Sequence, residues 1–484
     1  MGELPLGLSF DDVLMVPQHS SVLPEAVEIS THLTADIPLN IPVVSSAMDT
    51  VTEATLATAL AREGGIGVIH RNMPVSEQVE MVAKVKRAEN MVIPDPFTVG
   101  SDITLAELQV VMANRGVNGF PVIDKNDVLI GMVTSRDIWY IENPEETVAG
   151  VMTPQDKLVT APKSTTLNEA RRILYQNRIE KLPLIDEHGK LAGLITAQDI
   201  ENRQKFVNAA KDPKGRLRVG AAIGVGDDCL DRAAAVIEAG ADAVFIDAAT
   251  GHTTRVFDLI EKLRSEFDIT VVAGNVVTKE GAQDLVSAGA NVVKVGVGPG
   301  SICTTRVIAG VGVPQFTAIQ EVSEVCRANG VTTIADGGIR YSGDIVKAMA
   351  AGADMVMLGS LLAGCRESPG AIVNYQGRTW KEYRGMGSLK AMRKGSGDRY
   401  GQNSSGKLVA EGVEARVPYR GPLSDTIFQL LGGLRSGMGY VGANDLADLR
   451  EKARFVRITP GGLKESHAHD ITITEEPVNY QQST

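Results

Sequence analysis

The sequence predicts an α/β protein built on a (β/α)8 TIM barrel, with a second domain inserted in it. Short β-branched runs alternate with amphipathic helical patterns through most of the 484 residues, which is typical of a parallel sheet covered by helices. The segments EAGADAVFID, SAGANVVKVG and AAGADMVMLG each end a helix with glycine, turn and enter a strand, so the same helix-to-strand loop is used repeatedly. Eight such strands fit a closed barrel.

We expect the eight strands where short apolar runs are bounded by turn residues. Their ranges are 42–47, 66–70, 219–225, 243–249, 270–276, 292–298, 332–338 and 355–360. Helical patterns such as TEATLATALAREGG and DDCLDRAAAVIEAGA lie between most of them. The barrel is therefore expected from residues 1–90 and 205–484.

A different duplication interrupts the barrel between about residues 91 and 204. GVNGFPVIDKNDVLIGMVTSRDI (116–138) is echoed by RIEKLPLIDEHGKLAGLITAQDI (178–200), and both copies lead to Thr-x-x-Asp at a helix start. These pairs are Thr134 with Asp137 and Thr196 with Asp199. The arrangement resembles a tandem pair of cystathionine-β-synthase-type (CBS) modules, about 91–148 and 149–204. The resemblance implies a regulatory site for purine nucleotides of the ATP or GTP class at these residues. The alternative is a structural pair whose aspartates only cap helices.

Composition excludes several classes of protein. A net charge of −11 disfavours nucleic acid as the main partner, because phosphate neutralisation needs a basic face. The four cysteines, Cys229, Cys303, Cys326 and Cys365, have no CxxC spacing, which indicates a reducing compartment. The first residues lack the features of a signal peptide, and no stretch approaches the roughly 18 apolar residues of a membrane helix. We therefore expect a cytoplasmic protein without membrane contact.

One cysteine lies in a glycine-crowded turn, GVGPGSICTTR (296–306). Cys303 follows the sixth predicted strand, and barrel enzymes place catalysis on the loops after the C-terminal ends of the strands. A thiolate there would be a covalent nucleophile. No histidine follows it closely in sequence, so activation must come from backbone donors, a helix terminus or the substrate. The turn could also direct several carbonyls at a cation, but it lacks the G-x-G-x-x-G spacing of a dinucleotide-binding fingerprint.

The loops after the seventh and eighth predicted strands, ADGGIR and LGS, predict a ribose-phosphate site. Gly337, Gly338, Gly359 and Ser360 allow the backbone to approach a phosphate closely. Asp336 could accept hydrogen bonds from sugar hydroxyls. The alternative is that these glycines serve turn geometry alone.

A long segment beyond the eighth strand, about residues 383–422, is rich in glycine, serine and basic residues and has little periodicity. A loop of this length inside a compact domain is usually a lid or disordered. We expect a mobile lid.

Seven motifs together indicate a family. They are LSFDDVLMVP near the start, GNV (274–276), GVGPGSICTTR, ADGGIR, EYRGMGS, SGDRY and the C-terminal ESHAHDI. With the insert, the chain resembles the inosine-5′-monophosphate (IMP) dehydrogenases over essentially its whole length. These enzymes oxidise IMP to xanthosine 5′-monophosphate with NAD⁺, the committed step toward guanine nucleotides.

The resemblance implies catalytic roles. Cys303 would attack purine C2, and a covalent thioimidate would remain after hydride transfer to NAD⁺. Arg399, with Tyr400, would be the base for hydrolysis of that intermediate, and Thr305 would help to position the water. Because a guanidinium is normally never deprotonated, the alternative for Arg399 is an electrostatic or positioning role.

The resemblance also implies binding residues. The substrate contacts would be Ser46, Met48, Ser301, Asp336, Gly337, Gly338, Gly359, Ser360, Tyr383, Gly385, Met386, Gly387 and Glu411, with Glu411 near N1 of the base. The NAD⁺ path would be lined by Asp247, Thr250, His252, Asn275, Gly296 and Gly298. A potassium ion would take carbonyls of Gly298, Gly300 and Cys303, with Glu465, Ser466 and His467 added by a neighbouring subunit. A homotetramer, or an octamer of stacked tetramers, is therefore expected, although ESHAHDI alone would also suit a solvated tail.

Two rival functions are open to such a sequence. Guanosine monophosphate (GMP) reductases have the same barrel and cysteine, but we expect them to lack both the insert and the Arg-Tyr element of the lid. A nucleotide-binding scaffold with a decayed barrel is the other rival, and the intact Cys303, Thr305, Asp336 and Arg399 argue against it.

Overall fold

The computed structural model of the protein describes residues 4–88, 93, 96–402, 406–477 and 479–480. The chain divides into two compact units, residues 1–88 with 208–484 and residues 89–207. The expected boundary at residue 91 lies outside the described residues, and the other, at residue 204, lies in the last helix of the second unit. Each unit has its own hydrophobic core.

The first unit is a parallel barrel, which confirms the predicted fold class. Within the described residues its eight strands are β4 (Val43–Ser45), β5 (Gly67–Ile69), β12 (Val219–Ile223), β13 (Ala243–Ile246), β14 (Thr270–Val276), β15 (Val292–Val295), β16 (Thr332–Asp336) and β17 (Met355–Leu358). They are hydrogen-bonded in the order β4-β17-β16-β15-β14-β13-β12-β5. A parallel bridge between Val44 and Ile66 closes the circle. All eight predicted strands are present; β14 has the predicted bounds, and the other seven are somewhat shorter than their apolar runs.

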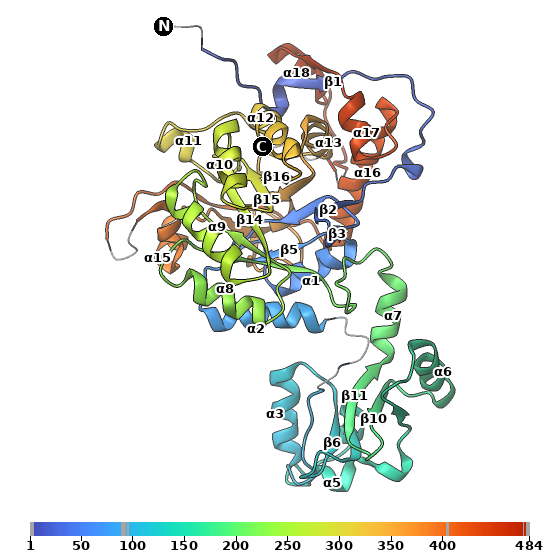
Figure 1. Ribbon diagram of the computed structural model, residues 1–484. Coiled ribbons are helices and arrows are strands. Elements are labelled where there is room, and N and C mark those ends of the chain that lie inside the picture. Colours follow the sequence, from blue (N-terminus) through green and yellow to red (C-terminus); the bar gives the residue numbers. More distant parts are fainter. Residues whose placement is uncertain (1–3, 89–92, 94–95, 403–405, 478, 481–484) are drawn as a thin grey trace. The chain divides into compact units, whose positions relative to one another are not determined.

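Helices surround the strands, as the alternating pattern predicts (Figure 1). They are α1 (Ala54–Glu63), α2 (Val75–Arg87), α8 (Cys229–Glu238), α9 (Thr254–Glu266), α10 (Lys279–Ser287), α12 (Gln315–Ala328), α13 (Ser342–Ala351) and α16 (Leu423–Val441). Short α11 (Thr305–Ile308) follows β15 after the loop 296–304, and short α14 (Ser360–Ala363) follows β17 almost directly. Apolar helix faces and the outward sides of the strands form one large core, which is the ordinary layer arrangement of this fold.

A hairpin of β2 (Thr31–Thr34) and β3 (Ile37–Leu39) covers the N-terminal end of the barrel, where it contacts the first residues of β14 and β16. Leu33, Ile37 and Leu39 form one cluster with interior side chains such as Phe245 and Met357. The interior is therefore a packed core, which leaves the site to the opposite, C-terminal end of the strands.

Another group of elements of this unit lies toward the two chain ends. They are η1 (Phe10–Asp12), β1 (Val13–Met15), η2 (Pro24–Ala26), α17 (Leu446–Lys452), β21 (Phe455–Arg457) and α18 (Pro460–Ser466). Strand β1 pairs antiparallel with β21, so residues from both ends of the chain lie side by side. Phe316 of α12 packs edge-on against Phe455 beneath this pair, with ring centroids 4.8 Å apart.

The segment expected to be a lid, about residues 383–422, contains regular secondary structure. Strands β18 (Ile372–Tyr375), β19 (Arg378–Arg384) and β20 (Glu414–Pro418) form an antiparallel sheet, and α15 (Leu389–Lys394) and the 3-10 turn η4 (Ser396–Tyr400) lie between β19 and β20. Local periodicity misses this fold because β19 pairs with residues about thirty positions further along the chain. The segment's mobility stays a prediction.

The second unit contains two copies of one αβ arrangement. The first is α3 (Leu105–Arg115), β6 (Gly119–Ile123), β7 (Leu129–Thr134), α4 (Ser135–Ile138), α5 (Val148–Val151), β8 (Thr153–Pro154) and η3 (Gln155–Lys157). The second is β9 (Ala161–Pro162), α6 (Leu167–Asn177), β10 (Lys181–Ile185), β11 (Leu191–Thr196) and α7 (Ala197–Lys205). The register of β6 with β7 recurs in β10 with β11.

The two copies join through their acidic turns in a reciprocal way. The Leu129 N–H donates to the Gly189 carbonyl, and the Leu191 N–H donates to the Asp127 carbonyl, both at 3.2 Å. Because each bond is the counterpart of the other at the sequence offset of the repeat, the two copies are related by an approximate twofold axis.

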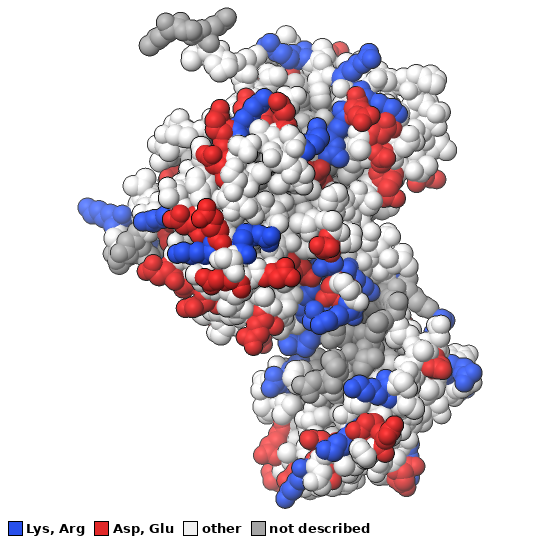
Figure 2. Space-filling model, in the orientation of Figure 1, with Lys and Arg blue, Asp and Glu red and all other residues white. Residues whose placement is uncertain are grey.

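On the face drawn in Figure 2, acidic and basic side chains are interspersed over both units. None of the helices in the described residues combines the length and the apolar character needed to span a bilayer.

Candidate active site

The C-terminal ends of the barrel strands surround a cavity of about 370 Å³. Every predicted substrate-binding residue lines this cavity. So do Cys303, Arg399 and Tyr400, and four of the six residues predicted for the NAD⁺ path, Asp247, Asn275, Gly296 and Gly298. A cavity of this size is in the range of small-molecule sites. Loops from seven parts of the chain thus meet at one place, as a TIM barrel requires.

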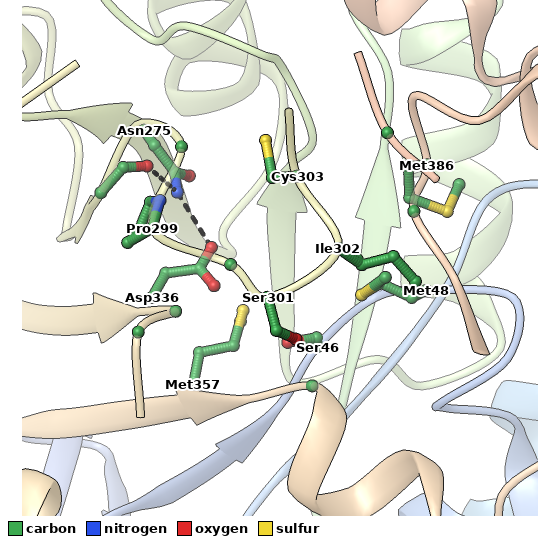
Figure 3. A pocket seen from close by; sticks show the side chains of 18 of the residues that line it. Ser46, Met48, Asn275, Pro299, Ser301, Ile302, Cys303, Asp336, Met357 and Met386 are labelled. Carbon is green, nitrogen blue, oxygen red and sulfur yellow. Dashed lines mark hydrogen bonds between the residues drawn. The ribbon is translucent and has the colours of Figure 1, made fainter. Parts of the chain in front are cut away.

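Cys303 lies in the loop after β15 and contacts the lid. Figure 3 shows it between Asn275 and Asp336 on one side and Met386 on the other. Its backbone bridges to Gly412 of the lid, and its N–H donates to the Gly300 carbonyl at 3.1 Å. The cysteine is therefore held by the backbone at a fixed place in the cavity wall.

A chain of polar contacts runs from this thiol into the lid. The Cys303 Sγ lies 3.2 Å from the Thr305 hydroxyl, which donates to the Glu411 carboxylate at 2.8 Å. The lid backbone reinforces the contact, because the Thr304 N–H donates to the Glu411 carbonyl at 2.9 Å. Thr305 thus connects the sulfur with a carboxylate that lines the cavity.

Two glycine-rich loops form the phosphate-type end of the cavity. Gly337 and Gly338 both adopt positive φ, at 90° and 81°, a conformation that favours glycine. A Cβ at Gly337 would lie 3.1 Å from Pro299 and 3.2 Å from the Gly300 nitrogen. On the neighbouring strand, Gly359 caps the short helix α14. Bare backbone N–H groups at such positions are suited to phosphate oxygens.

A lysine buried in the barrel fixes two of the predicted polar residues. Lys294 Nζ donates to the Asn275 side-chain oxygen at 2.7 Å and to Asp336 at 3.0 Å, and Asn275 donates to the same Asp336 oxygen at 2.9 Å. Sequence reasoning missed Lys294, although a lysine within the apolar run VVKVGVG was a signal. The two hydrogen bonds from Lys294 and Asn275 to one carboxylate oxygen hold Asp336 in a fixed orientation, as a hydrogen-bond acceptor for sugar hydroxyls requires.

Arg399 of the lid contacts the barrel at Asp247. The guanidinium contacts the Asp247 carboxylate at 2.7 Å, and the Arg399 carbonyl accepts from the Ala249 N–H at 3.2 Å. Burial of the guanidinium lowers the pKa of Arg399, but Asp247 and other neighbouring groups outweigh it, so the pKa lies above its ordinary value. In this conformation Arg399 is a cation.

One polar atom of Arg399 is left for a ligand. Within the described residues, its Nε is buried without a hydrogen-bond partner. Because a buried N–H without a partner is costly, a substrate or water that accepts this hydrogen bond would bind favourably. Sequence reasoning also missed Arg71, which lies against the other side of Asp247 at 3.3 Å.

Several predicted residues lie outside the cavity. Thr250 does not line it, and the exposed His252 contacts Asp284 at 2.8 Å. Glu465 and Ser466 end α18. His467 borders a separate hollow with Asp11, Arg340 and the C-terminal segment, and its Nδ1 lies 3.1 Å from the Tyr480 hydroxyl.

One of the two expected pairs of the insert, Thr134 with Asp137, caps a helix in the structure. The Thr134 N–H and hydroxyl both donate to Asp137 at 2.7 Å, which is a capping box. Thr196 ends β11 at the start of α7, and the side chain of Asp199 lies outside the described residues. Capping and nucleotide binding are compatible roles, so the regulatory prediction stays a prediction.

Fold and site together define a class: a TIM-barrel enzyme with a cysteine at the mouth beside two phosphate-type loops. Residues 7–469 match the IMP dehydrogenase / GMP reductase domain family. The chain is 57% identical to inosine-5′-monophosphate dehydrogenase of Aquifex aeolicus (strain VF5) over 478 residues, covering 98% of this chain and 97% of that protein. The enzyme of the same name from Bacillus subtilis (strain 168) is 52% identical over 477 residues, covering 98% of both chains.

A crystal structure of GMP reductase C318A from Trypanosoma brucei, in complex with guanosine 5′-monophosphate, is also similar. It has a TM-score of 0.91 and 40% identity, covering 97% of this chain and 99% of that one. The chain belongs to the IMP dehydrogenase / GMP reductase family, as the motifs predict, and its curated relatives are NAD-dependent oxidoreductases.

One expectation needs correction. We expected GMP reductases to lack the insert, but the 3% of this chain left unmatched by that GMP reductase is too short to contain residues 89–207. The insert therefore does not separate the two activities of the family.

Proposed function

We propose that the protein oxidises IMP to xanthosine 5′-monophosphate with NAD⁺, through a covalent intermediate on Cys303. The observation that carries the proposal is the position of this thiol, in a cavity with the phosphate-type loops, Asp336 and the Arg399–Tyr400 pair. The identities of 52–57% to enzymes named for this reaction, against 40% to a GMP reductase, support the direction of the chemistry.

The substrate would lie with its phosphate on Gly337, Gly338, Gly359 and Ser360. Its ribose hydroxyls would donate to Asp336, which Lys294 and Asn275 hold in place. The base would then extend toward Cys303 and Met386, with Glu411 near N1. Each part of a purine nucleotide has a partner of suitable chemistry in the cavity.

In the first half-reaction, the Cys303 sulfur forms a bond to purine C2, and C2 loses a hydride. NAD⁺, when bound, supplies the acceptor for that hydride. Thr305 lies between the thiol and the Glu411 carboxylate, so these two residues offer a route for the thiol proton. A covalent thioimidate remains on Cys303.

In the second half-reaction, water adds to C2 and the sulfur leaves as the product forms. Tyr400 and Arg399 line the same cavity. Because Arg399 is a cation while it contacts Asp247, it would orient water and stabilise negative charge in this conformation. Acting as the base would require it to leave Asp247.

For NAD⁺, the residues fit in part. Asp247 and Asn275 line the cavity and offer polar partners for a ribose or a carboxamide. Asp247 is occupied by Arg399 here, and Thr250 and His252 lie further out. The lid and the dinucleotide would therefore occupy this part of the site one after the other. One cavity could then carry out hydride transfer first and hydrolysis afterwards.

For a monovalent cation, the donor set fits. The carbonyls of Gly298, Gly300 and Cys303 come from one tight turn, and oxygen donors suit hard cations. Glu465, Ser466 and His467, added by a second copy of the chain, would complete the shell. This arrangement would make a homotetramer, or a stacked octamer, part of the active enzyme.

The inserted unit would be a sensor for purine nucleotides of the ATP or GTP class. Its support is the duplication, with equal strand registers and reciprocal contacts between the copies. A nucleotide would bind near the helix starts that Thr134, Asp137, Thr196 and Asp199 mark.

The test is the absorbance of NADH after IMP and NAD⁺ are added to the full chain, in potassium buffer and in sodium buffer. Turnover that depends on potassium supports the reaction and the cation site together. Absence of NADH in both buffers would overturn the proposal. Turnover of GMP with NADPH would then assign the reductase reaction instead, which the similarity to the Trypanosoma brucei enzyme makes the second candidate.

A further inference from the structure

We infer that Arg71 is a positioning residue that latches the catalytic turn of the lid onto the barrel. The inference rests on the proposed function for its meaning in the reaction, because the turn carries Arg399 and Tyr400. The latch itself is a contact between Arg71 and Asp398, the residue before Arg399.

The contact is a two-pronged ion pair. Arg71 Nη1 and Nη2 donate to the two Asp398 carboxylate oxygens at 3.0 and 2.8 Å. Such two-pronged pairing is specific to arginine, since an ammonium offers no planar fork. Arg71 follows β5, whereas Asp398 lies in η4 of the lid, so the pair joins the lid to the rigid barrel.

Four charges of alternating sign form a row here. Asp398 contacts Arg71, Arg71 contacts Asp247 at 3.3 Å, and Asp247 contacts Arg399 at 2.7 Å. The lid therefore contributes one carboxylate and one guanidinium, Asp398 and Arg399, and the barrel contributes one of each, Asp247 and Arg71. Lys294 adds further positive charge near Asp247.

Gly224, after β12, supplies a second observation. A Cβ built there would lie 2.9 Å from Arg71 Nη1 and 3.0 Å from the Asp398 carboxylate. Its φ is not in the left-handed region, so the backbone conformation does not require glycine. The missing side chain instead leaves room for this ion pair.

The lid can leave this row of charges without leaving Arg71 or Asp247 buried and unpaired. Arg71 and Asp247 are 8% and 7% exposed, whereas Asp398 is 36% exposed. When the lid leaves, Arg71 and Asp247 keep each other, and Asp398 returns to water. Because the lost contact is partly solvated, its strength is modest, as a reversible latch needs.

The first test needs no substrate. We expect trypsin to cleave the lid, after Arg393, Lys394 or Arg399, at least fivefold faster in Arg71→Lys, Asp398→Asn and Gly224→Ala than in the unmodified chain. Arg71→Lys keeps a cation for Asp247 but removes the fork, and Gly224→Ala removes neither charge. Glu414→Gln is the matched control, because it breaks an ion pair of the lid with Lys390 that does not reach the barrel, and it should be cleaved at the unmodified rate.

The second test separates the half-reactions. With IMP and NAD⁺, Asp398→Asn and Arg71→Lys should keep the rapid NADH burst within twofold and lose about tenfold in the steady-state rate. A role in general stability would instead lower both phases together.

Cleavage of the three variants at the unmodified rate would overturn the latch, as would equal loss of burst and steady state. If the unmodified chain forms no NADH from IMP and NAD⁺, the proposed function fails, while the substrate-free cleavage still decides whether the latch exists.

Discussion

At the scale of single residues, the site is a set of short polar contacts around one thiol. Cys303 touches Thr305, and Thr305 touches Glu411. The other described cysteines differ in environment: burial raises the pKa of Cys365 to about 11 and that of Cys326 to about 12. Those two thiols stay protonated at neutral pH and are structural.

Removing the proposed nucleophile, Cys303, should abolish NADH formation and spare the binding of IMP. Cys303→Ala deletes one sulfur from the cavity wall and leaves the phosphate-type loops intact, so IMP should bind within about threefold of the unmodified affinity. NADH formation should fall by at least about a thousandfold, because no covalent intermediate can form. Calorimetry measures the affinity for IMP, and absorbance measures the rate of NADH formation. Appreciable turnover by this variant would contradict the covalent route.

Arg399→Ala should separate the two half-reactions. The burst of NADH should persist, because hydride transfer needs Cys303 and not the lid cation. The steady-state rate should fall by about a hundredfold as hydrolysis slows. That fall corresponds to an activation free energy that is higher by roughly 2.7 kcal/mol. Stopped-flow absorbance measures both phases, and a matched fall in both would refute a role in hydrolysis.

At the scale of elements, the barrel residues on either side of the insert form a buried ion cluster. Lys86, near the end of α2, contacts Asp212 at 3.2 Å and Asp242 at 2.6 Å. Asp212 lies just after the insert, and Arg218 also contacts Asp242 at 3.0 Å. The chain therefore leaves and re-enters the barrel at one clamped place.

Lys86→Met should destabilise the barrel, because two buried carboxylates lose a partner. Removing one member of a buried ion pair costs about 3 kcal/mol. The free energy of unfolding from urea titrations at pH 7 should show this loss, and a change below about 0.5 kcal/mol would disprove the role of the clamp.

The pH dependence of that loss has a definite sign. Burial raises the pKa of Asp212, but the Arg216 N–H and the Lys86 charge lower it more, so the pKa lies below its ordinary value of 3.8. A lowered pKa contributes stability that is present above pH 3.8 and is lost as the pH falls through the folded-state pKa. The difference between Lys86→Met and the unmodified chain should therefore be largest near neutral pH and shrink below about pH 4.

At the scale of the whole molecule, two units with separate cores share one chain. Lys86 and Asp212, on either side of the insert, lie in contact, so a short linker can replace residues 89–207. The barrel cavity is lined entirely by residues of the first unit.

Deleting residues 89–207 should leave turnover within about threefold, because no cavity residue is lost. The response of the rate to added ATP or GTP should disappear. Steady-state rates with and without each nucleotide, for both chains, measure this. A response that survives the deletion would place the regulatory site in the barrel.

Much of this molecule was predictable because the signals are local. The eight strands follow from apolar runs bounded by turn residues, and Cys303, Gly337 and Gly338 are marked by their glycine-rich surroundings. The repeat in the insert was visible as a sequence echo. The predicted ends of the strands were less exact, because an apolar run continues beyond the last hydrogen bond between neighbouring strands.

The remainder could not be read from the chain. Arg71 and Asp398 lie 327 residues apart, and nothing near either residue indicates the other. The sheet within the lid depends on the pairing of β19 with β20, and the insert did not discriminate between the two activities of the family.

The sequence by itself determined the barrel, the duplicated insert and the positions of Cys303 and the glycine-rich loops, because periodicity and turn chemistry act between neighbours in the chain. Only the tertiary structure decided that Lys294 orients Asp336, that Thr305 joins Cys303 to Glu411, and that Arg399 rests on Asp247. These are electrostatic contacts across the barrel mouth. Their partners are set by where the strands end in space, which no local pattern encodes.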